Sequence, residues 1–320
     1  MIFYVSKEYS PSSVGLLKSS LPDAQIKIFH PKEALPDDFK DSSGLLIRSS
    51  FTVHNALLKE MSKLKWLVTS TSGFDHIDLK ACSNYGVQVS YTPEGNVQSV
   101  VELTTYFILE LQHQFAHQQN MLKNFQWKDQ LNKSHEVKEK TLGIIGFGRI
   151  GREVCRVSQA IGLNVIVCDP YVDPILIEER NAESVGLSEI LRMSDFLTLH
   201  VPLTNKTRGM INEKTLELMQ SSSFLINTSR GNVVKEVALI EALKNKTIAG
   251  AALDVFSSEP LPRESSLRDL DNLIMTPHSG AYTQEAFERV SRQAVEQTIA
   301  YFSEGKNAAP LPPNASWYED

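Results

Sequence analysis

The stretch TLGIIGFGRIG, residues 141–151, most restricts what this chain can fold into. A short apolar run leads into Gly146, Gly148 and Gly151, and a helical pattern, IGREVCRVSQAIG, leaves from them. Glycine triplets often only allow a tight turn, but a strand before them and a helix after them indicate a more specific unit. In that setting the first glycine makes the turn, the second lets backbone approach a pyrophosphate, and the third lets helix and strand pack closely. The stretch therefore predicts a dinucleotide held at a helix N-terminus.

Asp169 stands 23 positions after Gly146, at the end of the next apolar run, NVIVCD. A carboxylate there can accept hydrogen bonds from both ribose hydroxyls and would repel a 2'-phosphate. The following DPYVDP contains no arginine that would reverse this preference. The alternative is that Asp169 ends a strand and caps a turn before Pro170. The strand, glycines and helix around it favour the cofactor role over this alternative. The spacing predicts NAD rather than NADP as the cofactor.

Short apolar segments alternate with helical ones along the rest of the chain. This alternation is typical of α/β folds whose parallel sheets are covered by helices on both faces. Domains usually hold roughly 100 to 200 residues, so we expect two domains, each a doubly wound parallel sheet. The expected strands of the first are 2–5, 25–29, 44–49, 65–70 and 87–91, and those of the second are 142–146, 164–169, 196–201, 223–229, 249–255 and 272–277.

Residues 99–125, from Ser99 onward, carry one long helical pattern with apolar residues on more than one face. Such a helix is usually buried against a large surface. Residues 117–140 are polar and end in a charged run, which indicates a connector or an arm.

Composition narrows the class of protein. Apolar residues make up 42% and charged residues 22% of the chain, which is ordinary globular composition. No apolar run approaches the roughly 18 residues of a membrane span, and MIFYVSKEYS is too short an apolar stretch for a signal peptide. A net charge of -6 argues against a nucleic-acid partner. Cys82, Cys155 and Cys168 lack metal-type spacing and are expected to be reduced packing thiols, so we expect a cytoplasmic protein without a metal site.

Three ionisable residues follow expected strands of the second domain: Arg230 after FLINTS, Glu259 after ALDVF and His278 after NLIMTP. Ligands of open parallel sheets bind outside the carboxyl ends of the strands, so these residues can converge. Oxidation of a 2-hydroxy acid needs a base for the hydroxyl proton, a cation for the carboxylate and an acceptor for the hydride. Taken singly, a turn arginine, a solvated glutamate and a histidine cap are equally good readings. Together, beside a dinucleotide loop, they favour a catalytic site.

Ordered motifs then carry a resemblance to a known family. They are TLGIIGFGRIGREV, HVPLTNKTRGMIN, FLINTSRGNVV, ALIEAL, AGAALDVFSSEPLP and TPHSGAYT, and weaker likeness extends from about Gly44 to Gly305. The sequence resembles the NAD-dependent D-2-hydroxyacid dehydrogenases and looks most like their D-3-phosphoglycerate dehydrogenase branch. The chain ends about 15 residues after Gly305, so we expect it to lack the regulatory domain of that branch.

The resemblance implies an architecture and a partner. A Rossmann cofactor domain, 99–297, is expected as an insertion in a flavodoxin-like substrate domain formed by 1–98 and 298–320. Relatives dimerise through the helix and arm of residues roughly 100 to 140, so a homodimer is expected.

The resemblance also implies site residues. Arg230 would grip the substrate carboxylate, His278 would exchange the substrate proton near neutral pH, and Glu259 would raise the pKa of His278. His200 in LTLHVP is interpreted as structural rather than catalytic. Residues implied along the cofactor are Gly146, Gly148, Arg149, Ile150, Gly151, Asp169, Val201, Pro202, Thr228, Ser229, Asp254, His278, Ser279, Gly280 and Ala281, with Asp254 as the acceptor for the carboxamide.

The first domain should supply substrate contacts. TSTSGFDHID, residues 69–78, resembles the family loop whose backbone amides hold the substrate carboxylate, with Ser72 and Gly73 as candidates. Arg48 in GLLIRSS either meets a substrate phosphate or is a surface charge at a strand end. The departures from the family pattern at Thr71, Ser72 and Glu94 leave the shape of the pocket open.

Two functions from different classes remain. The first is a D-2-hydroxyacid dehydrogenase acting on a small anionic 2-hydroxy or 2-keto acid, with 3-phosphoglycerate, glycerate or hydroxypyruvate, and glyoxylate as candidates. The alternative is an NADH-sensing corepressor-like scaffold with little turnover, which can retain Arg230, Glu259 and His278.

Overall fold

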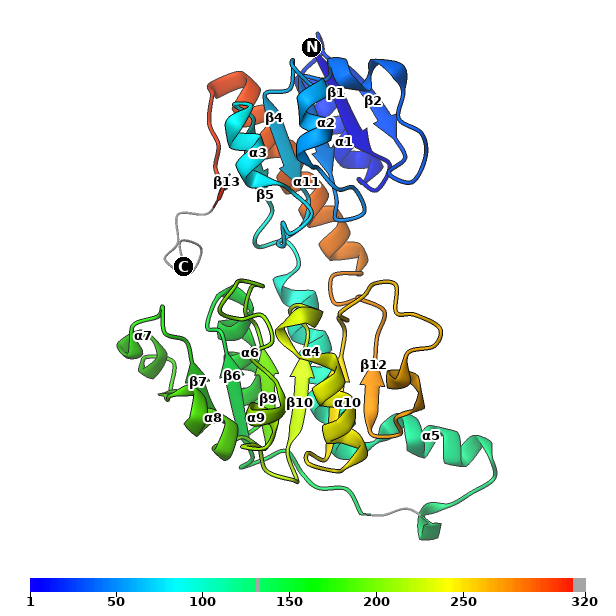
Figure 1. Cartoon of the computed structure of the whole chain (residues 1–320), viewed down its shortest axis with the longest axis vertical. Helices are drawn as coiled ribbons and strands as arrows, with labels where there is room; N and C mark the ends of the chain where they lie inside the picture. The colour runs from blue at the N-terminus through cyan, green and yellow to red at the C-terminus, as the bar shows by residue number, and fades with distance from the viewer. Residues whose placement is uncertain (131–132, 313–320) are drawn as a thin grey trace. The chain divides into compact units, whose positions relative to one another are not determined.

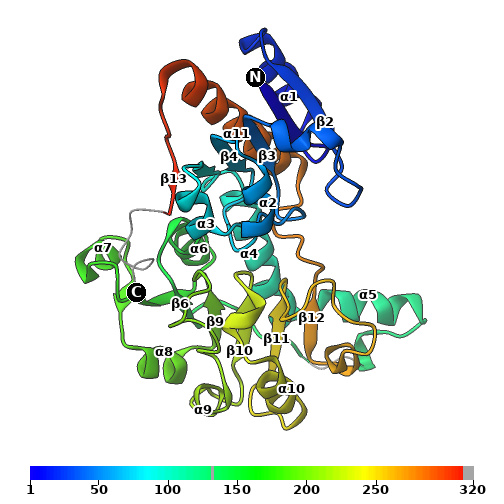
Figure 2. The same ribbon diagram turned by 45° about the horizontal axis from the view of Figure 1, so that its top comes forward.

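The computed structural model describes residues 1–130 and 133–312 and divides into two compact units. Unit 1 is formed by Met1–Asn96 together with the segment from Ala281 onward, and unit 2 by Val97–Gly280. Figures 1 and 2 show a twisted sheet flanked by helices within each unit. The expected α/β class with two parallel-strand sheets is confirmed. No helix among the described residues is long and apolar enough to span a membrane.

The sheet of unit 1 has the strand order β13-β5-β4-β3-β1-β2. Strands β1 to β5 pair in parallel, in the flavodoxin-like order 2-1-3-4-5, and β13 adds antiparallel to β5 at one edge. The sequence pattern did not predict β13, which pairs through only two residues. The strands are β1 (Ile2–Ser6), β2 (Gln25–Phe29), β3 (Gly44–Ile47), β4 (Trp66–Thr69), β5 (Gln88–Tyr91) and β13 (Pro310–Leu311).

Helices cover both faces of this sheet because neighbouring strand residues point to opposite sides. Phe3 and Val5 of β1 pack with one core cluster, while Tyr4 between them packs with the other. The first cluster lies under α1 and α11, and the second lies under α2 and α3. The helices are α1 (Pro11–Ser20), η1 (Asp37–Asp41), α2 (Asn55–Glu60), α3 (Leu79–Asn84) and α11 (Gln284–Glu304).

The boundary expected at 297/298 differs from the division in the structure, which lies at 280/281. Helix α11 is continuous from Gln284 to Glu304 and packs on unit 1 along its length. Near its start the Ser291 hydroxyl accepts a hydrogen bond from the Ser10 amide at 3.2 Å. Further along, the buried Trp66 indole donates to Thr298 Oγ1 at 2.9 Å. Residues 281–297 therefore belong with unit 1, and the expected last segment also includes 313–320, which lie outside the described residues.

The sheet of unit 2 has the strand order β12-β11-β10-β9-β6-β7-β8 and is parallel throughout its described pairs. Renumbered from β6, this is the Rossmann order 3-2-1-4-5-6 with one further strand. The two-residue strand β8 was not predicted from the sequence. The strands are β6 (Thr141–Ile145), β7 (Asn164–Cys168), β8 (Glu183–Ser184), β9 (Phe196–Leu199), β10 (Phe224–Asn227), β11 (Gly250–Leu253) and β12 (Leu273–Met275).

Helices α4 and α6 pack on one face of the unit 2 sheet, and α8, α9 and α10 pack on the other. Each face has its own cluster of fully buried aliphatic and aromatic side chains. The helices are α4 (Val97–His113), α5 (Phe115–Lys123), η2 (Lys128–Gln130), α6 (Arg149–Ala160), α7 (Pro174–Glu178), α8 (Leu187–Met193), α9 (Glu213–Leu216), η3 (Gly231–Val233), α10 (Glu236–Lys244) and η4 (Ser266–Asp269).

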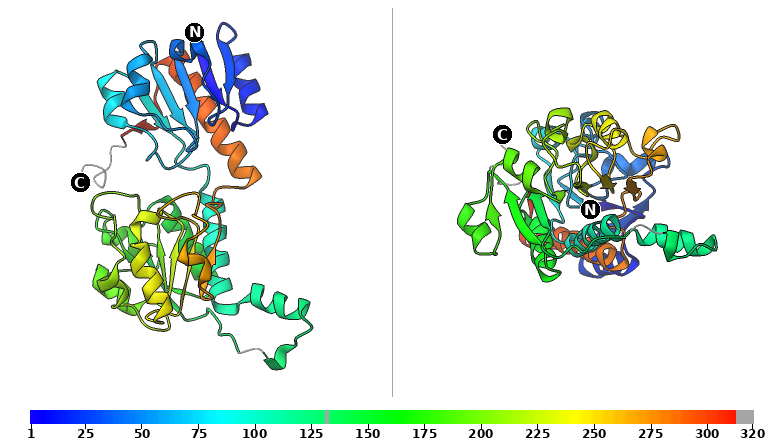
Figure 3. Two further views of the ribbon diagram at one scale, coloured as in Figure 1. Left: turned by 45° about the vertical axis from the view of Figure 1, so that its right-hand side comes forward. Right: turned by 90° about the horizontal axis from the view of Figure 1, so that it is seen from below.

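The single long helix expected over 99–125 is wrong, because the chain breaks into α4 and α5 at Gln114. Gln114 adopts a left-handed conformation with φ of 56°. The buried Glu110 carboxylate then accepts a hydrogen bond from the Ala116 amide at 3.0 Å, near the start of α5. Figure 3 shows α5 standing away from the unit 2 sheet. The expected arm is therefore a separate helix, and residues 131–132 of that prediction lie outside the described residues.

Candidate active site

The glycine loop joins β6 to α6 at the carboxyl end of the unit 2 sheet. Gly146 has φ of 96°, and a Cβ there would lie 2.5 Å from the carbonyl oxygen of His200. A Cβ at Gly151 would lie 2.2 Å from the carbonyl oxygen of Gly146. By contrast, a Cβ at Gly148 would meet no heavy atom within 4 Å. The first and third glycines are thus required by close packing, while the second faces open space.

That open space suits the phosphates of a dinucleotide. Gly148 is the N-cap residue of α6 and has no side chain to accept from the first helical amides. The amides and the positive end of a 12-residue helix therefore face the space beside Gly148. The residues present at this loop fit a pyrophosphate.

Asp169 follows β7 and reaches back to the glycine loop. Its Oδ2 accepts a hydrogen bond from the Phe147 amide at 2.7 Å, and its Oδ1 accepts from the Tyr171 amide at 2.9 Å. Each carboxylate oxygen can accept a second hydrogen bond. The carboxylate is thereby fixed beside the loop and retains acceptor capacity for ribose hydroxyls, so this residue also fits the cofactor.

Arg230 follows β10 in a turn that is held by Asn227. Asn227 donates through Nδ2 to the Arg230 carbonyl at 2.9 Å, and its Oδ1 accepts from the Ser229 amide at 3.0 Å and hydroxyl at 2.8 Å. The guanidinium donates through Nη1 to the Ser229 carbonyl at 2.7 Å. A Cβ at Gly231 would lie 1.9 Å from the Phe256 carbonyl oxygen, so glycine lets the loops after β10 and β11 touch.

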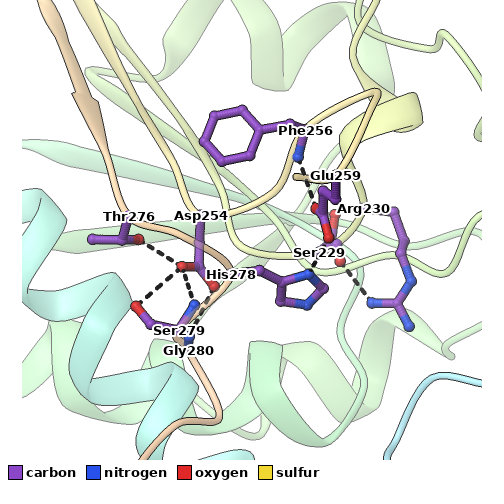
Figure 4. Close-up of polar contacts among 9 residues, drawn as sticks. All are labelled: Ser229, Arg230, Asp254, Phe256, Glu259, Thr276, His278, Ser279 and Gly280. Carbon is purple, nitrogen blue, oxygen red and sulfur yellow. Dashed lines mark hydrogen bonds and ion pairs between the residues drawn. The ribbon is translucent and has the colours of Figure 1, made fainter. Parts of the chain in front are cut away.

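His278 and Glu259 form a hydrogen-bonded pair. The Nδ1 atom of His278 lies 2.6 Å from Oε2 of Glu259, and Oε1 of Glu259 accepts from the Phe256 amide at 3.0 Å. Figure 4 shows the imidazole between Asp254 on one side and Glu259 with Arg230 on the other. Residues from the ends of β10, β11 and β12 are therefore brought together, as the sequence pattern predicted.

The pair shifts the pKa values of both partners. The hydrogen bond to Glu259 raises the pKa of His278 above its usual value, against the lowering effects of burial and of the nearby Arg230 charge. Burial alone would raise the pKa of Glu259, but the hydrogen bonds from His278 and the Phe256 amide outweigh it and the pKa is lowered. The pair thus favours the charged form of each side chain relative to the same group in isolation.

Asp254, after β11, is 2% exposed and holds the segment that carries His278. Its Oδ1 accepts from Thr276 Oγ1 at 2.6 Å and from the Ser279 amide at 2.7 Å, while Oδ2 accepts from the Gly280 amide at 2.9 Å (Figure 4). The His278 amide donates to the Asp254 carbonyl at 2.8 Å. These bonds fix His278 in a left-handed conformation with φ of 52°, which is uncommon outside glycine.

The other residues expected near the cofactor lie at the same edge of the sheet. His200, Val201 and Pro202 directly follow β9, and Thr228 follows β10, where its hydroxyl lies 3.4 Å from that of Thr104. The His200 ring is 3.0 Å from Thr198 Oγ1, and burial lowers its pKa to about 3. A ring held neutral in this way suits the structural reading of His200.

The residues expected to contact substrate, Arg48, Ser72 and Gly73, belong to unit 1, as does Ala281. Ser72 and Gly73 lie in the loop after β4. Asn96 donates to the Ser72 hydroxyl at 3.1 Å, and the Thr71 hydroxyl donates to the Gly73 carbonyl at 2.7 Å. Both loop residues are therefore anchored by neighbouring side chains.

Sequence reasoning missed the supporting residues of this site. Asn227 holds the turn of Arg230, the Phe256 amide holds Glu259, and Thr276 holds Asp254. In the sequence these three supporting residues could have been recognised only by their position, since each stands within three residues of a catalytic candidate, in NTSRG, DVFSSEP and TPHSG.

Comparison with known proteins agrees with this geometry. The family described as "D-isomer specific 2-hydroxyacid dehydrogenase, NAD binding domain" matches residues 105–280. A D-3-phosphoglycerate dehydrogenase of Methanocaldococcus jannaschii is 39% identical over 267 residues, which cover 83% of this chain and 51% of that protein. The chain spans about half the length of the curated relatives that it matches.

Solved structures are similar over nearly the whole chain. A D-lactate dehydrogenase of Aquifex aeolicus, complexed with NAD and lactic acid, has a TM-score of 0.86 and 29% identity, with 97% of this chain and 99% of that chain covered. A glyoxylate reductase of Paecilomyes thermophila has a TM-score of 0.88 and 25% identity, with 98% of each chain covered. The family match, the Rossmann strand order and the fit of the glycine loop lead to one conclusion: the chain belongs to the D-isomer specific 2-hydroxyacid dehydrogenase family and carries its NAD-binding domain.

Proposed function

We propose that this protein is an NAD-dependent oxidoreductase that interconverts a D-2-hydroxy acid and the corresponding 2-keto acid. The observation that carries the proposal is the grouping of Arg230, Glu259 and His278 at the carboxyl ends of strands in the NAD-binding unit. Similar proteins are named for phosphoglycerate, lactate and glyoxylate chemistry, which supports 3-phosphoglycerate and glyoxylate among the candidate substrates.

Each member of the group has a chemical task in this reaction. Arg230 presents a planar fork that pairs with the substrate carboxylate and places positive charge near the carbonyl oxygen. In the imidazolium form Nδ1 of His278 donates to Glu259, so the proton on Nε2 is the one that can be transferred. In the reductive direction His278 gives this proton to the carbonyl oxygen, which becomes the hydroxyl group. Glu259 fixes the ring and favours the imidazolium form.

NADH, when bound, supplies the hydride that the 2-keto carbon receives. We propose that the glycine loop, Asp169 and the residues after β9 to β12 hold the cofactor, as expected from the sequence. Asp254 is proposed as the acceptor for the carboxamide in addition to holding the His278 segment, because its oxygens can accept more than one bond each.

The direct test of this function is NADH consumption with glyoxylate, hydroxypyruvate and 3-phosphohydroxypyruvate. Turnover of at least one of these acids supports the proposal. Bound NADH without turnover of any of them would instead indicate a cofactor-sensing scaffold.

Exchange of Glu259 for glutamine tests its effect on the proton donor. Glu259 raises the pKa of His278, and reduction requires the imidazolium, so the rate is high below that pKa and is lost as the pH rises through it. The E259Q variant should therefore lose reductive kcat/KM at a lower pH than the unaltered protein. A pH profile of kcat/KM measures this, with E264Q, an exposed loop residue, as the control. The same inflection in both variants would contradict the assignment.

Exchange of Asp169 for serine tests cofactor choice. The variant removes the carboxylate that would accept from the ribose hydroxyls and repel a 2'-phosphate. We expect the preference for NADH over NADPH to fall by about 10- to 100-fold, which corresponds to roughly 1.4 to 2.8 kcal/mol. The ratio of kcat/KM for the two cofactors is the measurement. An unchanged ratio would show that the Asp169 carboxylate does not set the preference for NADH over NADPH.

Substrate contacts are proposed for Arg48 and for the loop of Ser72 and Gly73. The loop offers backbone amides to the substrate carboxylate, and Arg48 offers a cation to the distal end of the substrate. The anchoring of Ser72 by Asn96 and of Gly73 by Thr71 supports the loop as a preorganised binding element.

A second copy of the chain is the proposed protein partner, through α4 and α5. Large apolar side chains are exposed along α5 and just after it, including Phe115 at 51%, Leu122 at 57% and Trp127 at 63%. Exposed apolar patches of this kind are typical of protein interfaces. The mass of the protein in solution, measured by light scattering, decides between a monomer and a homodimer.

The proposed compartment is the cytoplasm. Cys82, Cys155 and Cys168 are unpaired, and burial raises the pKa of Cys82 to about 12 and that of Cys155 to about 11. Reduced, unreactive thiols of this kind suit a reducing environment.

A further inference from the structure

The carboxyl ends of β1 and β3 lie side by side in unit 1, where the strand order reverses. Strand β1 pairs with β2 on one side and with β3 on the other. In open α/β sheets this switch point is where ligands bind. Two opposite charges follow the strand ends here, Glu8 after β1 and Arg48 after β3.

The Glu8 carboxylate is held at this switch point by hydroxyl groups from both strand ends. Its Oε2 accepts hydrogen bonds from the Ser50 hydroxyl and from the buried Ser6 hydroxyl, the latter at 3.4 Å. The Glu8 amide also donates to the Ser6 hydroxyl at 3.2 Å. Since Ser50 lies two residues after Arg48, this network links the carboxylate to the loop that carries the guanidinium.

Arg48 lies beside the same switch point. Its guanidinium is 5.8 Å from the ring centre of Phe287, and it forms no ion pair within residues 1–130 and 133–312. Between Glu8 and Arg48 lies the buried Tyr9, which follows Glu8 in sequence and whose hydroxyl donates at 3.2 Å to the carbonyl of Ile47, the residue before Arg48. Burial raises the pKa of Tyr9, Arg48 lowers it and Glu8 raises it. Because the Glu8 carboxylate is bonded to Ser50, two residues after Arg48, we expect a ligand at Arg48 to experience the negative charge of Glu8 as well.

We propose that Glu8 is a specificity-determining residue that disfavours a phosphate at Arg48. This inference rests on the proposed function and refines its substrate class to unphosphorylated 2-keto and 2-hydroxy acids. A phosphate monoester carries about −1.5 to −2 charge at pH 7, so its repulsion by Glu8 offsets its attraction to Arg48. A distal hydroxyl group carries no charge and can donate to the carboxylate and accept from the guanidinium.

The test compares hydroxypyruvate with 3-phosphohydroxypyruvate as substrates of the full chain with NADH. The unaltered protein should have the higher kcat/KM with hydroxypyruvate. The E8Q variant, which keeps the shape and loses the charge, should narrow this ratio by about tenfold, equivalent to about 1.4 kcal/mol. The change should arise mainly from a lower KM for the phosphorylated acid, which a purely structural role of Glu8 would not produce.

The matched control is E60Q, at an exposed position at the end of α2, which should leave the ratio unchanged. An E8Q ratio equal to that of E60Q would overturn the inference. A preference of the unaltered protein for the phosphorylated acid would also overturn it, whether or not E8Q folds, and would leave the proposed function intact. Absence of turnover with every keto acid would refute the proposed function itself, and the inference with it.

Discussion

Replacement of His278 by alanine should lower kcat by about 10²- to 10⁴-fold, the usual contribution of a positioned acid or base. The variant loses the group that protonates the carbonyl oxygen. Neither Arg230 nor Glu259 is suited to replace it as a proton donor near neutral pH. The His278 backbone is fixed through Asp254 and not through its own ring. We therefore expect the affinity for NADH to remain nearly the same.

Steady-state kinetics and a fluorescence titration with NADH measure the two quantities separately. H135A, at an exposed histidine of the segment before β6, is the matched control and should retain both. If H278A lost turnover and NADH affinity to the same extent, the residue would be a structural support of the cofactor site and its role as proton donor would be wrong.

Replacement of Arg230 by alanine should lower kcat/KM for the keto acid by about 10²- to 10³-fold, the range seen when one group that stabilises transition-state charge is removed. R230K keeps the charge but not the planar fork that matches a carboxylate, so it should recover only a small part of the loss. The control is R263A, at an exposed position of the loop before η4.

The kinetic constants of the three variants separate the possible roles of Arg230. A loss through KM alone would indicate that Arg230 only binds the carboxylate. A loss in kcat as well would indicate that its charge also acts on the reacting carbonyl. Full activity of R230K would show that a point charge is sufficient, against the bidentate contact.

The parts of the fold that sequence could predict are those with a strong local pattern. The strand, glycine and helix pattern of 141–162 fixed β6 and α6, because apolar period and glycine conformation are both local properties. Arg230, Glu259 and His278 were found because parallel strands bring their carboxyl ends to one edge. Their convergence in one unit is thus a consequence of strand order.

The parts that sequence could not predict depend on contacts between distant segments. No glycine or proline near Gln114 indicates in the sequence that the helix ends there. The hydrogen bond from the Ala116 amide to Glu110, at the start of α5, is visible only in the structure. The boundary before α11 was misplaced because its pairing with Trp66 and Ser10 joins residues more than two hundred positions apart. The bonds of Asp254 to the His278 segment likewise span 22 to 26 positions.

The late position of α11 in the chain has a consequence for biosynthesis. One face of the unit 1 sheet, with Phe3, Val5 and Trp66, is covered in part by α11, which leaves the ribosome more than two hundred residues after those strands. Unit 2 is contiguous in sequence and can fold as soon as it has emerged, since domains generally fold as units during translation. The part of this face that α11 covers therefore stays exposed until α11 has been synthesised, which happens only after the whole of unit 2.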